Sequence, residues 1–203
     1  MNNFWDKLAK SYTKNTEKAF GEANNRVINE TKKYCTKGMN VLDVGCGTGL
    51  IIKDIAPFVS GVKAIDTSPE MIKEAKKNEI DNIEWETADL FSLNQEEHFS
   101  MVTAFNVLLY LDEVESVMQK IYSLLDQGGY FISVTDCLGE KRTFLSKLQS
   151  IGIKLGFFPK MTEFRITELK EIVKANGFTI VYEENVARKT NNYLIIAKKQ
   201  KRN

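Results

Sequence analysis

Three alternating glycines, Gly45, Gly47 and Gly49, directly follow an apolar run at residues 40–44. The apolar run predicts a buried β-strand. The glycines predict a tight turn in which the backbone takes positive φ angles and a ligand can approach without meeting a Cβ. The pattern that follows predicts a helix around residues 50–56. These residues thereby predict a strand, a glycine-rich turn and a helix in direct succession.

Strand and helix patterns alternate along most of the remaining sequence. Ser68 before Pro69 predicts the start of a helix over residues 69–77. Asp112 with Glu115 predicts the start of another, whose buried face is formed by residues 114, 117, 121 and 124 and which Gly128-Gly129 closes. Thr167 predicts the cap of a third helix, ended by Gly177. Further strands are expected at residues 62–65, 83–86, 101–105, 130–135, 178–182 and 193–197.

Strands separated by helices predict an α/β fold with a doubly wound, mostly parallel seven-stranded sheet, helices on both faces and an antiparallel last strand. Such sheets bind ligands at the carboxyl ends of their strands, near the point where the strand order reverses. Functional residues are therefore expected just after strands.

A length of 203 residues predicts a single domain over 1–203. Residues 1–37 are expected to form N-terminal capping helices, with one apolar stripe between Phe20 and Tyr34. Residues 138–164 are too apolar for a simple connection and predict an inserted lid that encloses a bound substrate. The apolar positions of this segment are Phe144, Leu145, Leu148, Ile151, Ile153, Leu155, Phe157 and Phe158.

The charge balance, 28 Lys plus Arg against 27 Asp plus Glu, gives a net charge of +1 and predicts no attraction to nucleic acid. The sequence contains no run of about 18 apolar residues, so we expect no membrane span, and no signal peptide is recognised. The three cysteines lack the spacing of metal ligands or of a disulfide framework, so we expect no metal and a cytoplasmic location. The C-terminal basic residues are expected to be a solvated tail; they are Lys198, Lys199, Lys201 and Arg202.

Acidic residues follow three consecutive predicted strands: Asp43, Asp66 and Asp89. Asp66 lies 23 residues after Asp43, where a carboxylate can accept hydrogen bonds from both hydroxyls of a ribose. This position is also acidic in nicotinamide enzymes, so Asp66 predicts a nucleoside cofactor without saying which one. An aspartate that merely starts a turn is the alternative at each of these positions.

Residues 41–50, V-L-D-V-G-C-G-T-G-L, resemble the first motif of the class I S-adenosylmethionine-dependent methyltransferases. They differ from the dinucleotide fingerprint GxGxxG, in which the third glycine falls one place later. Residues 66–71, D-T-S-P-E-M, and 86–90, E-T-A-D-L, resemble the segments after the second and third strands of that family. Residues 4–12, F-W-D-K-L-A-K-S-Y, are similar to the N-terminal helix of its small-molecule and quinone branch, methyltransferase type 11-like.

This resemblance implies a Rossmann-like methyltransferase fold and S-adenosylmethionine as the cofactor, with S-adenosylhomocysteine as its product. It implies that the glycine turn approaches the amino acid end of the cofactor, that Asp66 binds the ribose and that Asp89 faces the adenine amino group. Asn106 and Tyr110 are implied to position the reacting groups. The full set of implied cofactor contacts is Tyr12, Asp43, Gly45, Cys46, Gly47, Gly49, Asp66, Thr67, Met71, Asp89, Leu90 and Asn106.

Asn106 departs from the acidic or Asn-Pro-Pro-Tyr signatures of base methyltransferases, so the expected acceptor is a small, partly apolar molecule rather than nucleic acid. We expect in-line methyl transfer by a monomer or homodimer. His98, the only histidine, precedes a strand and is expected on the surface at the opposite edge of the sheet. Asp136 and Cys137 are better placed as acid or base groups, although Cys137 also suits a plain structural thiol.

Several alternatives remain open from the sequence alone. The chain could be a nicotinamide-dependent Rossmann oxidoreductase, which the glycine spacing and Asp43 disfavour, or a module that binds S-adenosylmethionine without catalysis. Tyr110 could be a packed core residue, and Tyr12 could belong to an ordinary amphipathic helix.

Overall fold

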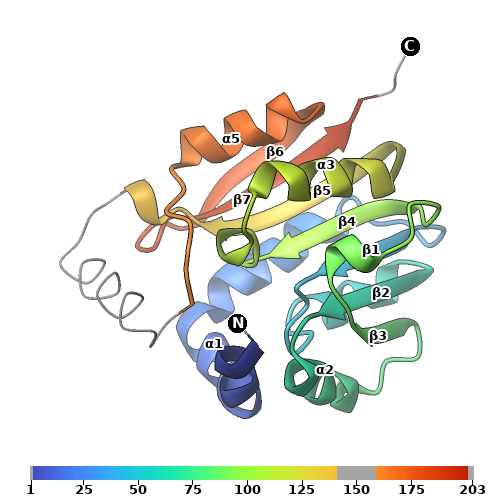
Figure 1. The fold of residues 1–203 in the computed structure, drawn as a ribbon, viewed down its shortest axis with the longest axis vertical. Coiled ribbons are helices and arrows are strands. Elements are labelled where there is room, and N and C mark those ends of the chain that lie inside the picture. The colour runs from blue at the N-terminus through green and yellow to red at the C-terminus, as the bar shows by residue number, and fades with distance from the viewer. Residues whose placement is uncertain (1, 141–158, 201–203) are drawn as a thin grey trace.

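The computed structural model describes residues 2–140 and 159–200 and contains one seven-stranded sheet with the order β3-β2-β1-β4-β5-β7-β6 (Figure 1). The pairs among the first five strands are parallel, and β7 runs antiparallel to both β5 and β6. This topology confirms the predicted mostly parallel sheet and its antiparallel last strand. The strands are β1 (Asn40–Val44), β2 (Gly61–Asp66), β3 (Ile83–Thr87), β4 (Phe99–Phe105), β5 (Leu125–Asp136), β6 (Phe178–Ala187) and β7 (Asn192–Lys199).

The strand order reverses beside β1, which pairs with β2 on one side and with β4 on the other. After β1, the chain adds β2 and then β3 on one side of β1. It then crosses back and adds β4 and β5 on the other side. The carboxyl ends of β1 and β4 therefore flank the crevice in which sheets of this kind bind ligands.

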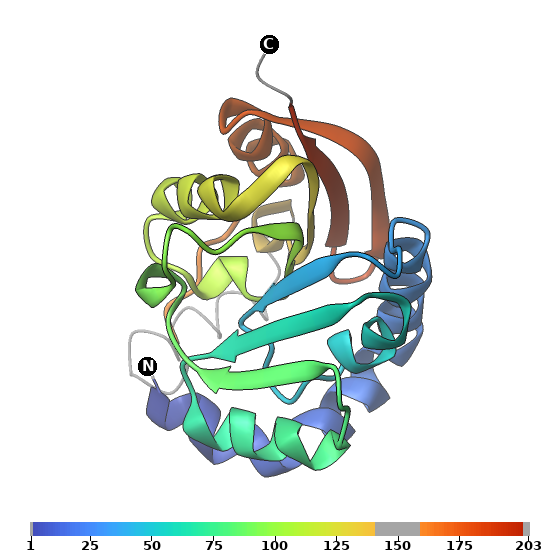
Figure 2. The same ribbon diagram turned by 90° about the vertical axis from the view of Figure 1, so that its right-hand side faces the viewer.

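Helices cover both faces of the sheet, as predicted (Figure 2). The helix α1 (Asn2–Lys32) packs on one face through Val27 and Ile28, in a core shared with the short 3₁₀ helices η1 (Ile52–Asp54) and η2 (Ala56–Phe58). The helices α3 (Val114–Leu124) and α5 (Ile166–Ala175) pack on the other face. The sheet is thus buried on both sides between two apolar layers.

The N-terminal segment forms one long helix rather than several. Its first half lies beside α2 (Pro69–Ala75), as Figure 1 shows at the lower end of the molecule. Asp6 on α1 accepts a hydrogen bond from the hydroxyl of Ser68 at 2.5 Å, and Thr13 shares a hydrogen bond of 2.8 Å with Thr48. The helix is thereby fixed to both turns that follow β1 and β2.

The prediction of a helix after the glycine turn is wrong, because η1 and η2 occupy this place as two separate 3₁₀ turns. Pro57 explains the difference. It has no backbone N–H, and its ring disfavours the α conformation of the residue before it. The chain between Gly49 and Pro57 forms short 3₁₀ turns instead of a continuous α-helix.

The predicted ends of α3 are also wrong. Its N-cap residue is Glu113, with a φ of 51° and no side-chain cap hydrogen bond, instead of a cap by Asp112 with Glu115. The helix ends at Leu124, ahead of Gly128-Gly129, because Leu125 already pairs with Phe99 of β4 and the glycines belong to β5. Pairing with the sheet overrides the local signals here.

Thr167 is not the cap of α5 but lies inside its first turn. The N-cap residue is Arg165, whose backbone N–H donates to the Glu168 carboxylate at 3.0 Å. At Ser68 the prediction is confirmed, since its hydroxyl accepts from the backbone N–H of Met71 at 3.2 Å and Pro69 follows.

The prediction of a solvated C-terminal tail is wrong for Lys199. Its residue is only 6% exposed, and its ammonium group donates to the backbone carbonyls of Tyr122 and Leu125, each at 2.6 Å. These carbonyls lie at the C-terminal end of α3, where a cation is stabilising. Lys198 lies over the Tyr130 ring at 5.3 Å, and residues 201 and 202 fall outside the described ranges.

Most of the predicted lid, residues 138–164, lies outside the described residues, which stop at 140 and resume at 159. Its described beginning is the 3₁₀ helix η6 (Leu138–Glu140). None of the described helices combines the length and apolar character that crossing a bilayer requires.

Candidate functional site

A pocket opens at the carboxyl ends of the parallel strands, where the topology predicts ligand binding. This main pocket is lined by Gly45 and Gly47 after β1, by Asp66 and Thr67 after β2, by Asp89 and Leu90 after β3, and by Asn106 after β4. Its empty volume, open to solvent, is about 840 Å³. Residues from four neighbouring strand ends thus surround one open space, which is the arrangement expected of a ligand site in such a sheet.

The three glycines of the turn all have positive φ but serve different purposes. Gly45 (φ 66°) and Gly47 (φ 55°) line the main pocket. Gly49 (φ 77°) does not line it; a Cβ there would overlap the Trp85 ring, coming within 2.9 Å of its Cζ3. The structure therefore does not bring Gly49 to the site, and its missing side chain makes room for a core aromatic residue.

Asp66 ends β2 and joins the glycine turn to the start of α2. One carboxylate oxygen, Oδ2, accepts from the backbone N–H of Gly47 at 2.9 Å, and Oδ1 accepts from the N–H of Ser68 at 2.8 Å. Burial raises the pKa of Asp66, while these two backbone hydrogen bonds act to lower it. An ionised carboxylate has about four acceptor sites, so Asp66 retains capacity for hydroxyls of a ligand in the pocket.

The other residues expected around the nucleoside are also at the main pocket. Asp89 ends the loop after β3 and is exposed, and its Oδ1 accepts from the backbone N–H of Phe91 at 2.8 Å, which caps the 3₁₀ helix η4 (Leu90–Ser92). Leu90 is buried beneath it, and Met71 and Thr67 complete the lining on the side of α2. Predicted positions from three strands thus converge on one cavity.

Asp43 lies behind the turn rather than in the main pocket. It is 2% exposed and accepts a hydrogen bond of 2.6 Å from the Thr103 hydroxyl. Burial raises its pKa to about 7, partly offset by the Thr103 bond. With Cys46, Thr16 and Asn24 it lines a smaller space that we call the turn cavity, which also contacts Gly45 and Gly47.

Asn106 adopts a left-handed backbone conformation, with a φ of 54°. Asparagine tolerates this region better than most residues. Its backbone N–H donates to the Val134 carbonyl at 2.7 Å, and its Oδ1 accepts from the Asn192 amide at 2.8 Å. Such an unusual conformation, held by bonds to β5 and β7, is typical of functional sites.

A third space lies against the first half of α1, and we call it the aromatic cavity. It is lined by Phe4, Trp5, Tyr12, Phe20 and Tyr110, together with Asn106, Asp136, Asn192 and Met161. Tyr12 and Asn106 line the main pocket, the turn cavity and the aromatic cavity alike. These two residues therefore mark the point at which the three spaces meet.

The aromatic side chains form a continuous wall. The Trp5 ring meets Tyr110 edge to face with centroids 4.9 Å apart, and meets Tyr12 and Phe4 at 6.3 and 5.0 Å. Burial raises the pKa of both tyrosines, so their hydroxyls are neutral at physiological pH. Tyr110 is thus both packed against Trp5 and exposed to the main pocket and the aromatic cavity.

The sequence did not single out Asn192, although the structure places it at the centre of this site. Its Nδ2 group donates to Asn106 at 2.8 Å and to the Asp136 carboxylate at 2.7 Å. The signal exists only in the pairing of β5 with β7, where Asp136 lies opposite Asn192. Trp5 entered the sequence analysis only as a member of residues 4–12, the segment that is similar to an N-terminal methyltransferase helix.

Two other candidates are outside the site. His98 is exposed at the start of β4, the end of the sheet opposite the main pocket, as predicted. Cys137 is buried, its thiol lies 3.7 Å from the Thr135 carbonyl, and burial raises its pKa to about 12, which makes it a poor nucleophile. Within the described ranges, no group of three or more His, Cys, Asp or Glu side chains could hold a metal ion.

A model of the methyltransferase domain family matches residues 35–177 of this chain. Malonyl-[acyl-carrier protein] O-methyltransferase 1 of Ilyobacter polytropus is 27% identical over 155 residues, which cover 73% of this chain and 56% of that protein. Sterol 24-C-methyltransferase of Clavispora lusitaniae is 30% identical over 168 residues, covering 77% of this chain and 44% of that protein. The matched part thus spans about half the length of these relatives.

Solved structures share the fold over nearly their whole length. Magnesium protoporphyrin IX methyltransferase from Synechocystis PCC 6803, with bound S-adenosylhomocysteine, superposes with a TM-score of 0.74 and 19% identity, covering 96% of this chain and 97% of that one. The N-methyltransferase NodS from Bradyrhizobium japonicum WM9 gives a TM-score of 0.69 and 16% identity, covering 92% and 99%. At these identities the likeness shows a common fold.

Proposed function

This chain belongs to the methyltransferase domain family, and we propose that it transfers a methyl group from S-adenosylmethionine to a small, partly apolar acceptor by in-line displacement. The observation that carries the proposal is the position of Asp66. Its carboxylate ends β2, is fixed by the backbone N–H groups of Gly47 and Ser68, and lines the main pocket beside the glycine turn.

The hydrogen-bond acceptors of the main pocket match the adenosine part of this cofactor. Asp66 is proposed to accept from the ribose hydroxyls, and Asp89 from the exocyclic amino group of the adenine. Thr67, Met71 and Leu90 provide the apolar and backbone surface between these two carboxylates. A neutral, largely apolar base with a single amino group suits a space that has acidic groups only at its edges.

The amino acid end of the cofactor is proposed to lie along Gly45, Cys46 and Gly47 toward the turn cavity, where Asp43 is buried. This arrangement brings the sulfonium to Tyr12 and Asn106, where the three spaces meet. The faces of aromatic rings such as Tyr12 and Tyr110 attract a cation at this point. Gly49 is left out of this proposal because it packs against Trp85.

Bound S-adenosylmethionine supplies a methyl group that is already activated on a positively charged sulfur. The protein must therefore mainly align an acceptor that enters from the aromatic cavity, with Asn106 and Tyr110 as positioning residues. Alignment of this kind can lower a barrier by roughly 7 to 11 kcal/mol.

Calorimetry with the cofactor and its demethylated product tests the proposal. Asp66→Asn should weaken binding of both by about 1.5 to 3 kcal/mol, the scale of hydrogen bonds to a charged group, which is roughly a 10- to 150-fold higher Kd. The matched control is Asp81→Asn, an exposed aspartate ahead of β3. A wild-type protein that binds NADH but neither S-adenosyl compound would refute the proposal, and an unchanged Kd for Asp66→Asn would refute the ribose assignment.

We further propose that residues 1–37 and 138–164 enclose the acceptor over one methyltransferase domain. Supporting this, α1 lines the aromatic cavity through Trp5, and the described end of the second segment lines it through Met161. The free cysteines Cys35, Cys46 and Cys137 support a reducing, cytoplasmic location. The near-zero net charge supports a small-molecule acceptor over nucleic acid, for a protein acting as a monomer or homodimer.

A further inference from the structure

We propose that the aromatic cavity binds the methyl acceptor as a protonated amine, and that the Asp136 carboxylate is both its counter-ion and the acceptor of its proton. This inference rests on the proposed methyltransferase function and adds the chemical class of its acceptor. Relatives named as O- and C-methyltransferases match the chain alike, so the acceptor atom has to be inferred from the cavity itself.

The cavity has the composition of a site for an organic cation. Its wall is built from the rings of Phe4, Trp5, Tyr12, Phe20 and Tyr110. Ring faces attract ammonium groups, and the attraction grows as the site becomes drier. The same rings provide apolar surface for the carbon skeleton of the acceptor.

Asp136 is the charged group in this wall, at the carboxyl end of β5. Its Oδ1 accepts from the Asn192 amide at 2.7 Å, and the other hydrogen of the same amide group goes to Asn106 at 2.8 Å. Asn106 also lines the main pocket. The carboxylate is thus linked through Asn192 to the residue that borders the proposed position of the sulfonium.

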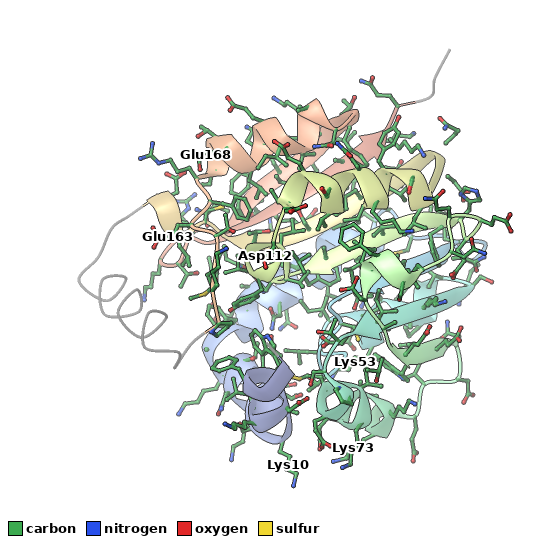
Figure 3. All side chains as sticks on the ribbon, in the orientation of Figure 1. Lys10, Lys53, Lys73, Asp112, Glu163 and Glu168 are labelled. Carbon is green, nitrogen blue, oxygen red and sulfur yellow. The ribbon has the colours of Figure 1, made fainter. Side chains whose placement is uncertain are left out.

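Among the residues described, the wall of this cavity contains no lysine or arginine that could neutralise Asp136. Lys160, between the lining residues Pro159 and Met161, is 78% exposed and pairs with Asp112 at 3.2 Å instead. On α1, Lys10 is exposed, and Figure 3 shows it projecting outward from the molecule. A carboxylate that no cation among the described lining residues neutralises favours a cationic ligand and disfavours an anionic one.

The proton has to leave before the nitrogen can react. One N–H proton moves from the ammonium to a carboxylate oxygen of Asp136, and its bonding electrons remain on nitrogen as a lone pair. The nitrogen then bonds to the methyl carbon while the electron pair of the breaking S–C bond stays on sulfur. The products are a methylated ammonium and a neutral thioether, so charge and atoms balance.

The surroundings of Asp136 bring its proton affinity closer to that of the amine. Burial raises the pKa of Asp136 above its ordinary value, opposed by the Asn192 hydrogen bond. Among the described residues, the titratable groups that interact electrostatically with it are Tyr12 from α1, Tyr110 after β4 and Cys137, which follows it in the chain. Burial raises the pKa of both tyrosines and of Cys137, so these groups stay neutral and Asp136 is the ionised group in this wall that can take up the proton.

Four probes that share a 2-phenylethyl group test the proposal: 2-phenylethylamine, 2-phenylethanol, 2-phenylethanethiol and 3-phenylpropionate. Binding of each to the full chain saturated with S-adenosylhomocysteine is measured by calorimetry, and methyl transfer from S-adenosylmethionine is measured by product formation. We expect the amine to bind at least 10-fold more tightly than the alcohol and the carboxylate, and to be methylated in preference to the alcohol, the thiol and the carboxylate.

The variant Asp136→Asn keeps an acceptor oxygen for Asn192 but removes the charge. It should raise the Kd of the amine at least 10-fold and lower its kcat/KM by 10- to 100-fold, while the Kd of S-adenosylhomocysteine changes less than twofold. The matched control is Asp126→Asn, an exposed aspartate at the other end of β5. It should leave all three constants unchanged.

Three results would overturn the inference: methylation of the alcohol, thiol or carboxylate in preference to the amine, equal amine affinity in Asp136→Asn and wild type, or no binding of the amine to a chain that binds S-adenosylhomocysteine. Each of these leaves cofactor binding intact. Failure to bind either S-adenosyl compound would instead remove the proposed function itself, so the two failures are distinguishable.

Discussion

Replacing Gly49 by alanine should destabilise the protein far more than replacing Gly47, although both glycines have positive φ and stand two positions apart. The φ angles are 77° and 55°. A Cβ at Gly49 would overlap the Trp85 ring, whereas a Cβ at Gly47 would meet only Tyr12 Cε1, at an ordinary 3.7 Å. The two variants therefore share a conformational cost, and only one adds a steric cost.

The magnitudes follow from these contacts. A left-handed conformation costs a non-glycine residue about 1 to 2 kcal/mol. Loss of flexibility in the unfolded chain offsets about 0.4 to 1 kcal/mol of this. Gly47→Ala should thus lower the free energy of unfolding by about 1 kcal/mol. Overpacking adds about 1 to 3 kcal/mol, so Gly49→Ala should lower it by about 2 to 4 kcal/mol.

Urea denaturation without cofactor measures these differences, and a double variant isolates the steric part. Trp85→Phe removes the ring atoms that Gly49→Ala would strike, so the combined variant should recover at least about 1 kcal/mol relative to the sum of the single effects. Calorimetry should show the opposite ranking for cofactor binding, since only Gly47 lines the main pocket. Equal destabilisation by the two alanines, or strict additivity with Trp85→Phe, would refute the reasoning.

Asp43 has a pKa of about 7 in the folded protein and about 3.8 when unfolded, so its contribution to stability is full below 3.8 and is lost as pH rises through 7. The free energy of unfolding of Asp43→Asn relative to wild type should therefore increase from pH 5 to pH 8.5, by on the order of 2 to 4 kcal/mol in urea unfolding. A difference between the two proteins that does not change with pH would contradict this. Lys199→Met leaves the carbonyls of Tyr122 and Leu125 without their donor and should cost about 1.5 to 3 kcal/mol, whereas unchanged melting would show that the buried ammonium adds nothing. Ser68→Ala should cost about 1 kcal/mol through loss of the cap on α2, with recovery by Ser68→Thr as the control.

The positions of the strands were largely predictable because apolar runs and turn residues are local signals. Strand β1 is found at the predicted residues 40–44, and β2 to β4 differ by one or two residues at their ends. Errors arose where a tertiary contact competes with a local signal. The end of α3 is one case, since pairing of Leu125 with Phe99 starts β5 ahead of the two glycines.

The sequence could place candidate residues together only as far as strand ends alone decide position. Asp66, Asp89 and Asn106 follow parallel strands and line one pocket. Asp43 follows a strand as well, yet its side chain is buried against Thr103 of β4. The sequence does not encode which way a side chain turns at the end of a strand.

The sequence by itself determined the α/β architecture, the glycine turn and the set of acidic residues after consecutive strands, because each depends on residues close together along the chain. Only the tertiary structure decided that Tyr12 and Asn106 stand where three cavities meet, and that Asn192 joins Asn106 to Asp136. Asn192 is 56 residues from Asp136 and 86 from Asn106, and the register of β5 with β7 sets their contact. A side chain's partners across a sheet follow from that register and from the packing of α1, which no local pattern contains.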